Sequence, residues 1–203
     1  MKKIFLVMLV FVTVTTQAQS YKQGQIDINV GMGLGSTFIS RSAFVAPNSS
    51  FHSMPVINVS GEYAITDDIG VGGFMGFSTA KWTYTSYYTK YNSSTGWVDY
   101  PYTDTWKYSF FILGGRGAYH FAKLIPVDKL DVYAGLMLGY NIATQKWTSS
   151  DPSHVVAYTG ASYGGFAYSV YGGARYRFTD KIGVFGELGY GVSILNIGLN
   201  IKI

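Results

Sequence analysis

The last nine residues of the chain alternate strictly between apolar and polar side chains. The apolar set is Leu195, Ile197, Leu199, Ile201 and Ile203, and the polar set is Asn196, Gly198, Asn200 and Lys202. A period of two predicts a β-strand with one apolar face. Either a protein core or lipid can cover such a face, so the alternation by itself leaves both environments open.

The N-terminus has the organisation of a secretory signal peptide. Basic residues at Lys2 and Lys3 precede a nearly unbroken apolar run, Ile4 to Val14, and a short polar exit follows it. The run is much shorter than the ~20 residues that a membrane-spanning helix needs. We therefore expect export with cleavage after Ala18, which leaves residues 1–18 as the signal peptide and 19–203 as one domain.

The composition favours lipid over water as the surrounding of the strands. Only 13% of the residues are charged, whereas 17% are aromatic, with 25 glycines and 18 tyrosines. A soluble surface carries about a quarter of its residues as charges. The chain has no cysteine, which excludes disulfides and thiol chemistry. Its net charge of +4 comes from scattered lysines and arginines without a basic stripe, so we expect no nucleic-acid partner.

Strand-like segments and their connections predict an all-β fold, an eight-stranded antiparallel up-and-down transmembrane β-barrel. The segments are about 25–38, 54–65, 69–84, 104–121, 130–147, 164–178, 182–191 and 194–203. Long connections at 40–53, 85–103 and 149–163 alternate with tight turns at 66–68 and 179–181. Outer-membrane barrels show this asymmetry, with short periplasmic turns and long extracellular loops.

An internal repeat sets the register of the strands. The segment 62–71 aligns with 175–184, and 118–121 is a weaker third copy, so Tyr63, Tyr119 and Tyr176 each stand just before a turn. Tyrosines at one height are typical of an aromatic girdle, here on the periplasmic side. With these rings outward, Ile26, Val30, Val59, Leu136, Val170 and their alternates also face out, because a slip of one residue reverses both faces.

The same register sends nearly all strand charges inward, among them Asp27, Glu62, Arg116, Asp131, Arg175 and Glu187. A soluble lipocalin-like ligand-binding barrel would have apolar side chains inside and polar ones outside, and it remains an alternative.

The export signal, the eight strands, the Thr-Asp-x-Ile-Gly turns at 66–70 and 179–183 and the terminal strands from Gly186 resemble one protein family. It is the small outer-membrane β-barrel family of Gram-negative bacteria, of the OmpA-transmembrane and OmpX-like, porin-family type. The resemblance implies a monomer in the cell outer membrane with both termini periplasmic. It also implies contact with outer-membrane lipid and lipopolysaccharide, and with the barrel-assembly machinery during biogenesis. Such chains usually end in an aromatic residue, and this one ends in Ile203.

Charged lumen residues form the first candidate site. Arg175 and Glu187 flank the last tight turn and are expected to pair, with Glu62 and Arg116 joining the cluster. A barrel of eight strands is just wide enough to be filled by side chains, and buried ions persist when paired. We expect a polar plug; a narrow ion or small-solute channel is the alternative.

A lipid A-modifying enzyme is a further alternative, which would use a serine with a histidine. His154 follows Ser153 closely, His52 precedes Ser53, and His120 is expected inside near the periplasmic end. Residues that lie close together in one loop rarely align as a nucleophile, a general base and a third residue that orients the base. We expect no catalytic residue, no cofactor and no metal site.

An aromatic cluster in the second long loop is the last candidate site. Trp82, Tyr84, Trp106 and Tyr108 are interpreted as the upper girdle, with the remaining rings prolonging the hairpin above the membrane. Exposed aromatic rings anchor partners at low entropic cost. Tyr87, Tyr88, Tyr91 and Trp97 are therefore candidates for recognising an extracellular glycan or protein. The expected role is structural or adhesin-like surface recognition.

Overall fold

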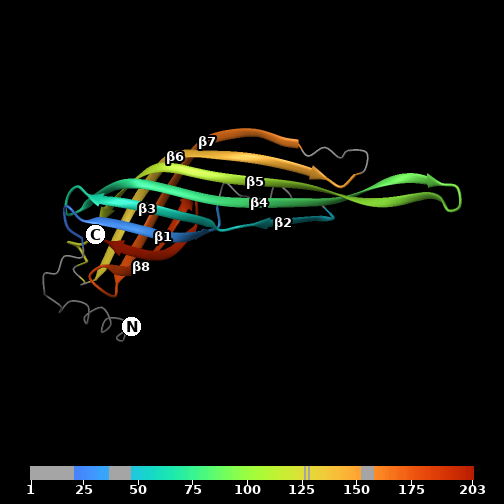
Figure 1. Ribbon diagram of the computed structural model, residues 1–203. Coiled ribbons are helices and arrows are strands. Elements are labelled where there is room, and N and C mark those ends of the chain that lie inside the picture. The colour runs from blue at the N-terminus through green and yellow to red at the C-terminus, as the bar shows by residue number, and fades with distance from the viewer. Residues whose placement is uncertain (1–20, 37–46, 126, 128, 152–157) are drawn as a thin grey trace, which may run out of the picture.

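Eight strands close into one antiparallel barrel in the computed structural model, which describes residues 21–36, 47–125, 127, 129–151 and 158–203 (Figure 1). The predicted signal peptide lies outside these residues. The barrel strands are β1 (Ile26–Leu34), β3 (Val56–Ala64), β4 (Ile69–Asn92), β5 (Gly96–His120), β6 (Leu130–Ser149), β7 (Tyr158–Arg177), β8 (Ile182–Gly191) and β9 (Leu195–Lys202).

Pairing of the first barrel strand with the last closes the ring. β1 pairs with β9 from Asp27↔Lys202 to Leu34↔Leu195, and consecutive barrel strands pair around the rest of the circle. The predicted fold class is therefore confirmed. In the part of the chain that the structure describes, no helix has the length and apolarity to cross a bilayer.

Side chains follow the predicted inside–outside alternation. Asp27 and Asn29 of β1 are buried, whereas Val30 is 44% exposed; on β7, Arg175 is fully buried and Val170 is 61% exposed. The outer surface is apolar, and the buried charged side chains lie inside. The soluble lipocalin-like alternative is therefore wrong.

The repeated Thr-Asp-x-Ile-Gly motif forms the same turn twice. The hydroxyl oxygen of Thr66 accepts hydrogen bonds from the backbone N–H groups of Asp68 and Ile69. Thr179 accepts in the same way from Lys181 and Ile182. A threonine hydroxyl that accepts hydrogen bonds from the backbone N–H groups two and three residues later stabilises a tight turn. A hydrogen bond to Asp68 also raises the pKa of Lys123, on the neighbouring connection.

The β4–β5 hairpin is longer than the sequence predicted. The expected loop at 85–103 is a continuous ladder up to Asn92↔Gly96, so both strands extend far beyond the barrel (Figure 1). Cross-strand contacts hold this extension: the rings of Tyr88 and Tyr100 stack at 5.5 Å. A short strand that was not predicted, β2 (Ser49–Ser53), pairs with β4 at the base of the extension.

Close packing fills the lumen beside the ring closure. Gly31 of β1 and Gly198 of β9 are cross-strand partners, and the buried ring of Phe185 lies over both. A Cβ added at Gly198 would lie 2.1 Å from the carbonyl oxygen of Val30 and 2.8 Å from the Phe185 ring. Gly31 therefore serves packing inside its strand, and Gly33 lies in the same way against Ser193.

This packing predicts the effect of a single methyl group. Gly198→Ala should destabilise the barrel by about 1–3 kcal/mol because a crowded site must shift its neighbours. Gly186→Ala on adjacent β8 is the control, since its added Cβ would meet no atom within 4 Å. The measurement is the temperature at which the fast-migrating folded band is lost on a detergent gel. Equal temperatures for both variants would contradict the packing described here.

Candidate functional site: charged lumen and extracellular hairpin

Arg175 is the centre of the charged lumen. Its guanidinium is fully buried and contacts carboxylates from three other strands. The nitrogen–oxygen distances are 3.1 Å to Glu62, 3.1 Å to Asp131 and 3.5 Å to Asp27. It also lies 4.4 Å from the centroid of the Tyr133 ring. One side chain therefore ties β7 to β1, β3 and β6 across the barrel interior.

Arg116 forms a second centre further from the turns. Its Nη2 atom donates to Glu187 Oε1 at 2.7 Å, and its Nη1 atom donates to the hydroxyl of Ser60 at 3.0 Å. Glu187 also accepts hydrogen bonds from the Tyr133 hydroxyl and the Asn196 amide. The Nε atom of Arg116 lies 3.7 Å from Glu62, which links the two centres.

The expected pairing of Arg175 with Glu187 is wrong. The hairpin pairs Arg175 with Phe185 and Glu187 with Gly173, so the two charges are offset along the barrel. The turn is centred on Asp180, because Phe178 and Thr179 both donate to the carbonyl of Ile182. Arg175 is five residues before this centre and Glu187 is seven after it, so the two residues are not opposite each other. The four predicted lumen residues lie together, with Glu62 and not Glu187 as the partner of Arg175.

His120 completes the network at the periplasmic end. Its ring nitrogens lie 2.8 Å from Asp131 and 2.9 Å from Glu62, and its ring stacks on Tyr21 at 3.5 Å. Carboxylates only accept hydrogen bonds, so both ring nitrogens donate and the imidazole is charged. Burial raises the pKa of the Tyr21 hydroxyl, which keeps it neutral.

The buried ions of the lumen balance. Arg116, His120, Arg175 and Arg177 carry four positive charges, and Asp27, Glu62, Asp131 and Glu187 carry four negative ones. Neutral, paired networks are the form in which ions persist away from water. The geometry thus fits a plug better than an aqueous path.

The histidines do not assemble a catalytic site among the described residues. Both nitrogens of His120 are held by carboxylates. His52 and Ser53 are successive residues of β2, so their side chains lie on opposite faces of that strand. His154 and Ser153 lie outside the described residues. No group of described acidic residues and histidines is placed to hold a metal ion.

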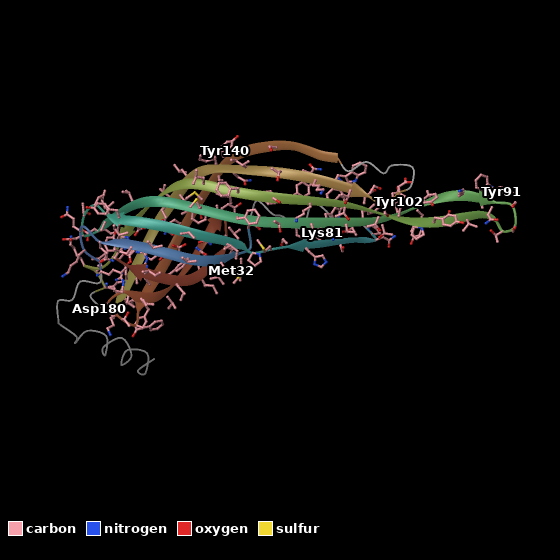
Figure 2. All side chains as sticks on the ribbon, viewed as in Figure 1. Met32, Lys81, Tyr91, Tyr102, Tyr140 and Asp180 are labelled. Carbon is pink, nitrogen blue, oxygen red and sulfur yellow. The ribbon has the colours of Figure 1, made fainter. Side chains whose placement is uncertain are left out.

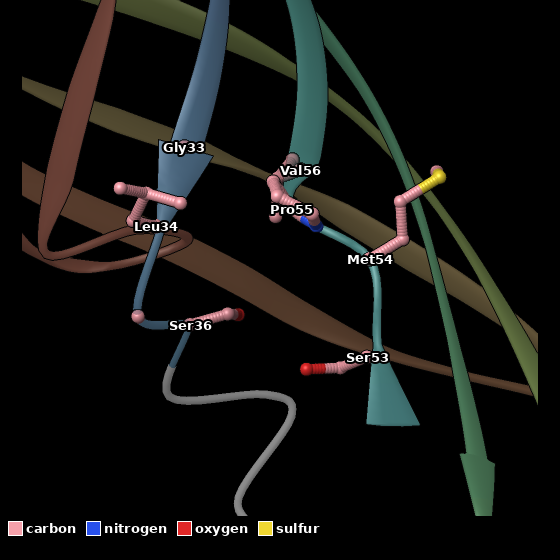
Figure 3. Close-up of a pocket in the computed structure, with 8 residues that line it drawn as sticks. Gly33, Leu34, Ser36, Ser53, Met54, Pro55 and Val56 are labelled. Carbon is pink, nitrogen blue, oxygen red and sulfur yellow. The ribbon is translucent and has the colours of Figure 1, made fainter.

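A small hollow of about 190 Å³ opens at the rim between the end of β1 and the start of β3. It is lined by residues 33–36 and 53–56, none of which is charged (Figure 3). Its polar side chains are the hydroxyl groups of Ser36 and Ser53.

The three girdle tyrosines point outward at the periplasmic end. Tyr63, Tyr119 and Tyr176 are 49%, 45% and 47% exposed. The interpretation of Trp82 and Trp106 as an outward upper girdle is wrong. Trp82 follows buried Ser78 and Ala80 at even spacing on β4, and its cross-strand partner Trp106 precedes buried Phe110 at even spacing on β5. Both therefore share the inward face, where their rings lie 4.8 Å apart.

The candidate recognition residues divide between the two faces of the extension. Tyr91 and Trp97 are direct cross-strand partners with ring centroids 5.4 Å apart, and Tyr87 shares their face. Tyr88 lies on the other face, against Tyr100 and Tyr102. We call Tyr87, Tyr91 and Trp97 the aromatic platform. Figure 2 shows Tyr91 near the tip of the hairpin, far from the barrel.

Sequence reasoning missed a row of lysines at the base of the extension. Lys81, Lys107 and Lys146 are aligned across β4, β5 and β6 on the outward face. The expectation that no basic stripe exists holds along the sequence but not across the sheet. The sequence did contain a signal for this row: three of the four tryptophans, Trp82, Trp106 and Trp147, are each next to one of these lysines.

Arg175→Met should destabilise the barrel by about 3–5 kcal/mol, because it leaves four buried carboxylates with three cations and takes from Glu62, Asp131 and Asp27 a cation that they share. The measurement is the urea midpoint of unfolding in lipid vesicles. Adding Glu62→Gln to this variant removes one unpaired charge and should recover part of the loss. A double variant less stable than Arg175→Met would contradict this assignment of partners.

Comparison with known proteins agrees with this architecture. The family described as "Outer membrane protein beta-barrel domain" matches residues 4–202. No curated protein matches the chain. Similar solved structures include the N-terminal β-barrel domain of Pseudomonas aeruginosa OprF, at 12% identity and a TM-score of 0.47, covering 89% of this chain and 98% of that one.

Pseudomonas aeruginosa OprG is similar at 11% identity and a TM-score of 0.49, covering 91% of this chain and 98% of that one. Escherichia coli outer membrane protein W is similar at 9% identity and a TM-score of 0.45, covering 90% and 99%. These likenesses are too distant to assign an activity. The family match spans nearly the whole chain, and this protein therefore belongs to the outer-membrane β-barrel domain family.

Proposed function

We propose that this protein is a plugged outer-membrane barrel that displays the β4–β5 hairpin for recognition of neutral carbohydrate outside the cell. The main observation in support of this proposal is the exposure of the aromatic platform: Tyr87, Tyr91 and Trp97 are 58%, 60% and 73% exposed.

The position of the platform separates it from the lipid-facing residues. Tyr91 is ten residues beyond Lys81, roughly 33 Å along an extended strand. Apolar side chains on the barrel wall are exposed in the isolated chain because lipid covers them. Lipid does not reach the platform, so its rings face water, and exposed apolar surface of this kind marks interaction sites.

The chemistry of the platform suits a sugar. The Tyr91–Trp97 pair and Tyr87 are separated by Thr89 and Asp99, whose side chains share a hydrogen bond of 2.6 Å. Flat rings stack on the C–H faces of pyranoses, while hydroxyl and carboxylate oxygens bond to sugar hydroxyls. Between residues 85 and 103, Lys90 and Asp99 are the charged residues, and they cancel. A neutral ligand is therefore favoured over an ionic one.

The other functions receive less support from the described residues. A channel would need an open lumen, whereas the interior ions are paired and balanced. A lipid A-modifying enzyme would need a histidine beside a nucleophile, whereas His120 is bound to two carboxylates.

Measuring solute uptake into liposomes distinguishes a plug from a channel. Glu187→Ala leaves Arg116 without its closest carboxylate and should lower the unfolding temperature of the barrel. Uptake of small solutes into liposomes containing the variant should equal that of the unmodified protein, because the remaining side chains still fill the lumen. Increased uptake would argue for a gated path.

Binding of displayed protein to a printed array of neutral glycans tests the recognition proposal. Replacing Tyr87, Tyr91 and Trp97 by Ser should lower binding at least 10-fold, whereas replacing them by Phe should retain most of it because the ring faces remain. The folded band of both variants on detergent gels shows that the barrel is intact. Equal binding by the Ser and Phe variants, or no neutral glycan bound by the unmodified protein, would overturn the proposal.

A further inference from the structure

The lysine row, Lys81, Lys107 and Lys146, is an alignment of like charges on one face of the sheet. Lys81 is the cross-strand partner of Lys107, and Lys107 is the partner of Lys146. His52 of β2 extends the row beside Lys81. Like charges directly opposite each other destabilise a sheet, so the arrangement calls for a compensating anion.

The described residues do not supply that anion. No carboxylate among them lies within 4.0 Å of these lysine nitrogens. Asp104, the acidic residue nearest in sequence to Lys107, lies on the opposite face of β5 because it is an odd number of residues away. The ammonium groups therefore face outward without an internal partner.

The height of the row points to the source of the anion. The last outward apolar row is Phe77, Phe111 and Ile142, each more than 40% exposed. Lys81 is four residues beyond Phe77, about 13 Å along the strand and, at a tilt near 40°, about 10 Å above the hydrocarbon edge. The polar headgroup zone extends about 5–7 Å from that edge, and a lysine stem can reach back into it.

An inner row of tryptophans holds the sheet in shape behind the lysines. The ring centroids of Trp82 and Trp106 are 4.8 Å apart, and those of Trp106 and Trp147 are 6.4 Å apart. These packed indoles lie on the opposite face, each one residue along its strand from a lysine of the row. The cations are therefore presented on rigid sheet rather than on a loop, which lowers the entropic cost of binding.

We propose that Lys81, Lys107 and Lys146 bind the phosphate groups of lipopolysaccharide in the outer leaflet. Short turns lie at the other end of the barrel, so the row is on the extracellular side, where the phosphorylated sugars of lipid A lie. Neighbouring strands are about 4.8 Å apart, so the three cations span about 10 Å and engage more than one phosphate of a lipid. A lipid-borne phosphate is also held at high local concentration beside the row.

The test titrates the full mature barrel, purified in neutral detergent, with fluorescent bisphosphorylated lipid A. Changing all three lysines of the row to Gln should weaken binding at least 10-fold. The matched control changes Lys22, Lys129 and Lys181 to Gln, which removes the same charge from exposed periplasmic positions and should alter affinity less than 2-fold. The heat-dependent gel shift verifies folding of each variant.

Two further titrations use the unmodified barrel and so do not depend on any variant folding. Lipid A lacking both phosphates should bind at least 10-fold more weakly, and inorganic phosphate at equal concentration should not displace lipid A. Equal loss in both triple variants, or equal affinity for dephosphorylated lipid A, would overturn the proposal. Displacement by inorganic phosphate would assign the row to free phosphate and overturn the lipid assignment.

Discussion

Backbone hydrogen bonding in hydrocarbon is the constraint on which this molecule depends. Lipid offers no partner for an exposed N–H or C=O group, so a sheet that crosses a membrane must have no open edge. Pairing of β1 with β9 removes the edge. With eight strands the resulting ring is narrow, and its lumen must be filled by side chains. The ion network around Arg175 and Arg116 and the Phe185 ring over Gly31 and Gly198 are two ways of filling it, one polar and one apolar.

The side chains that fill the lumen also determine which residues face outward. Contacts of Arg175 with three other strands allow one register, since a slip of a single residue would move a buried charge into lipid. In that register, alternate residues of one strand, β4, form a continuous outward face. From the periplasm outward it carries Val71, Phe77, Lys81 and then Tyr87 and Tyr91. A lipid-facing band, a cationic row and an aromatic platform thus follow from one alternation.

Features that depend on the alternation of side chains along a single strand could be predicted from the sequence. The strand order, the outward tyrosines and the inward charges belong to this class, because Asp27 or Tyr176 can be assigned to a face from its neighbours alone. Predicting which residues face each other across two strands requires the exact centre of each turn. Glu187 was expected as the partner of Arg175, but it is seven residues after the turn centre at Asp180 and Arg175 is five before it, and Glu62, Asp131 and Asp27 fill that role. Lys81, Lys107 and Lys146 are far apart in sequence, and they align only when both hairpin registers are known.

The rim of the barrel is uneven, and this unevenness relates the two proposed sites. β8 ends at Gly191, whose φ of +122° favours glycine, and the short connection 192–194 leads to β9. The wall is low there because both strands end at this connection. β4, β5 and β6 continue beyond the rim (Figure 1). The lysine row lies on the outward face of this high wall. A lipopolysaccharide molecule bound by its phosphates at that row would extend its sugars along the same face, toward Tyr87. By the strand rise and a tilt near 40°, the platform lies about 25–35 Å above the hydrocarbon edge. Sugars of the cell's own lipid must therefore be long to reach it, and shorter chains leave the rings open to an external ligand.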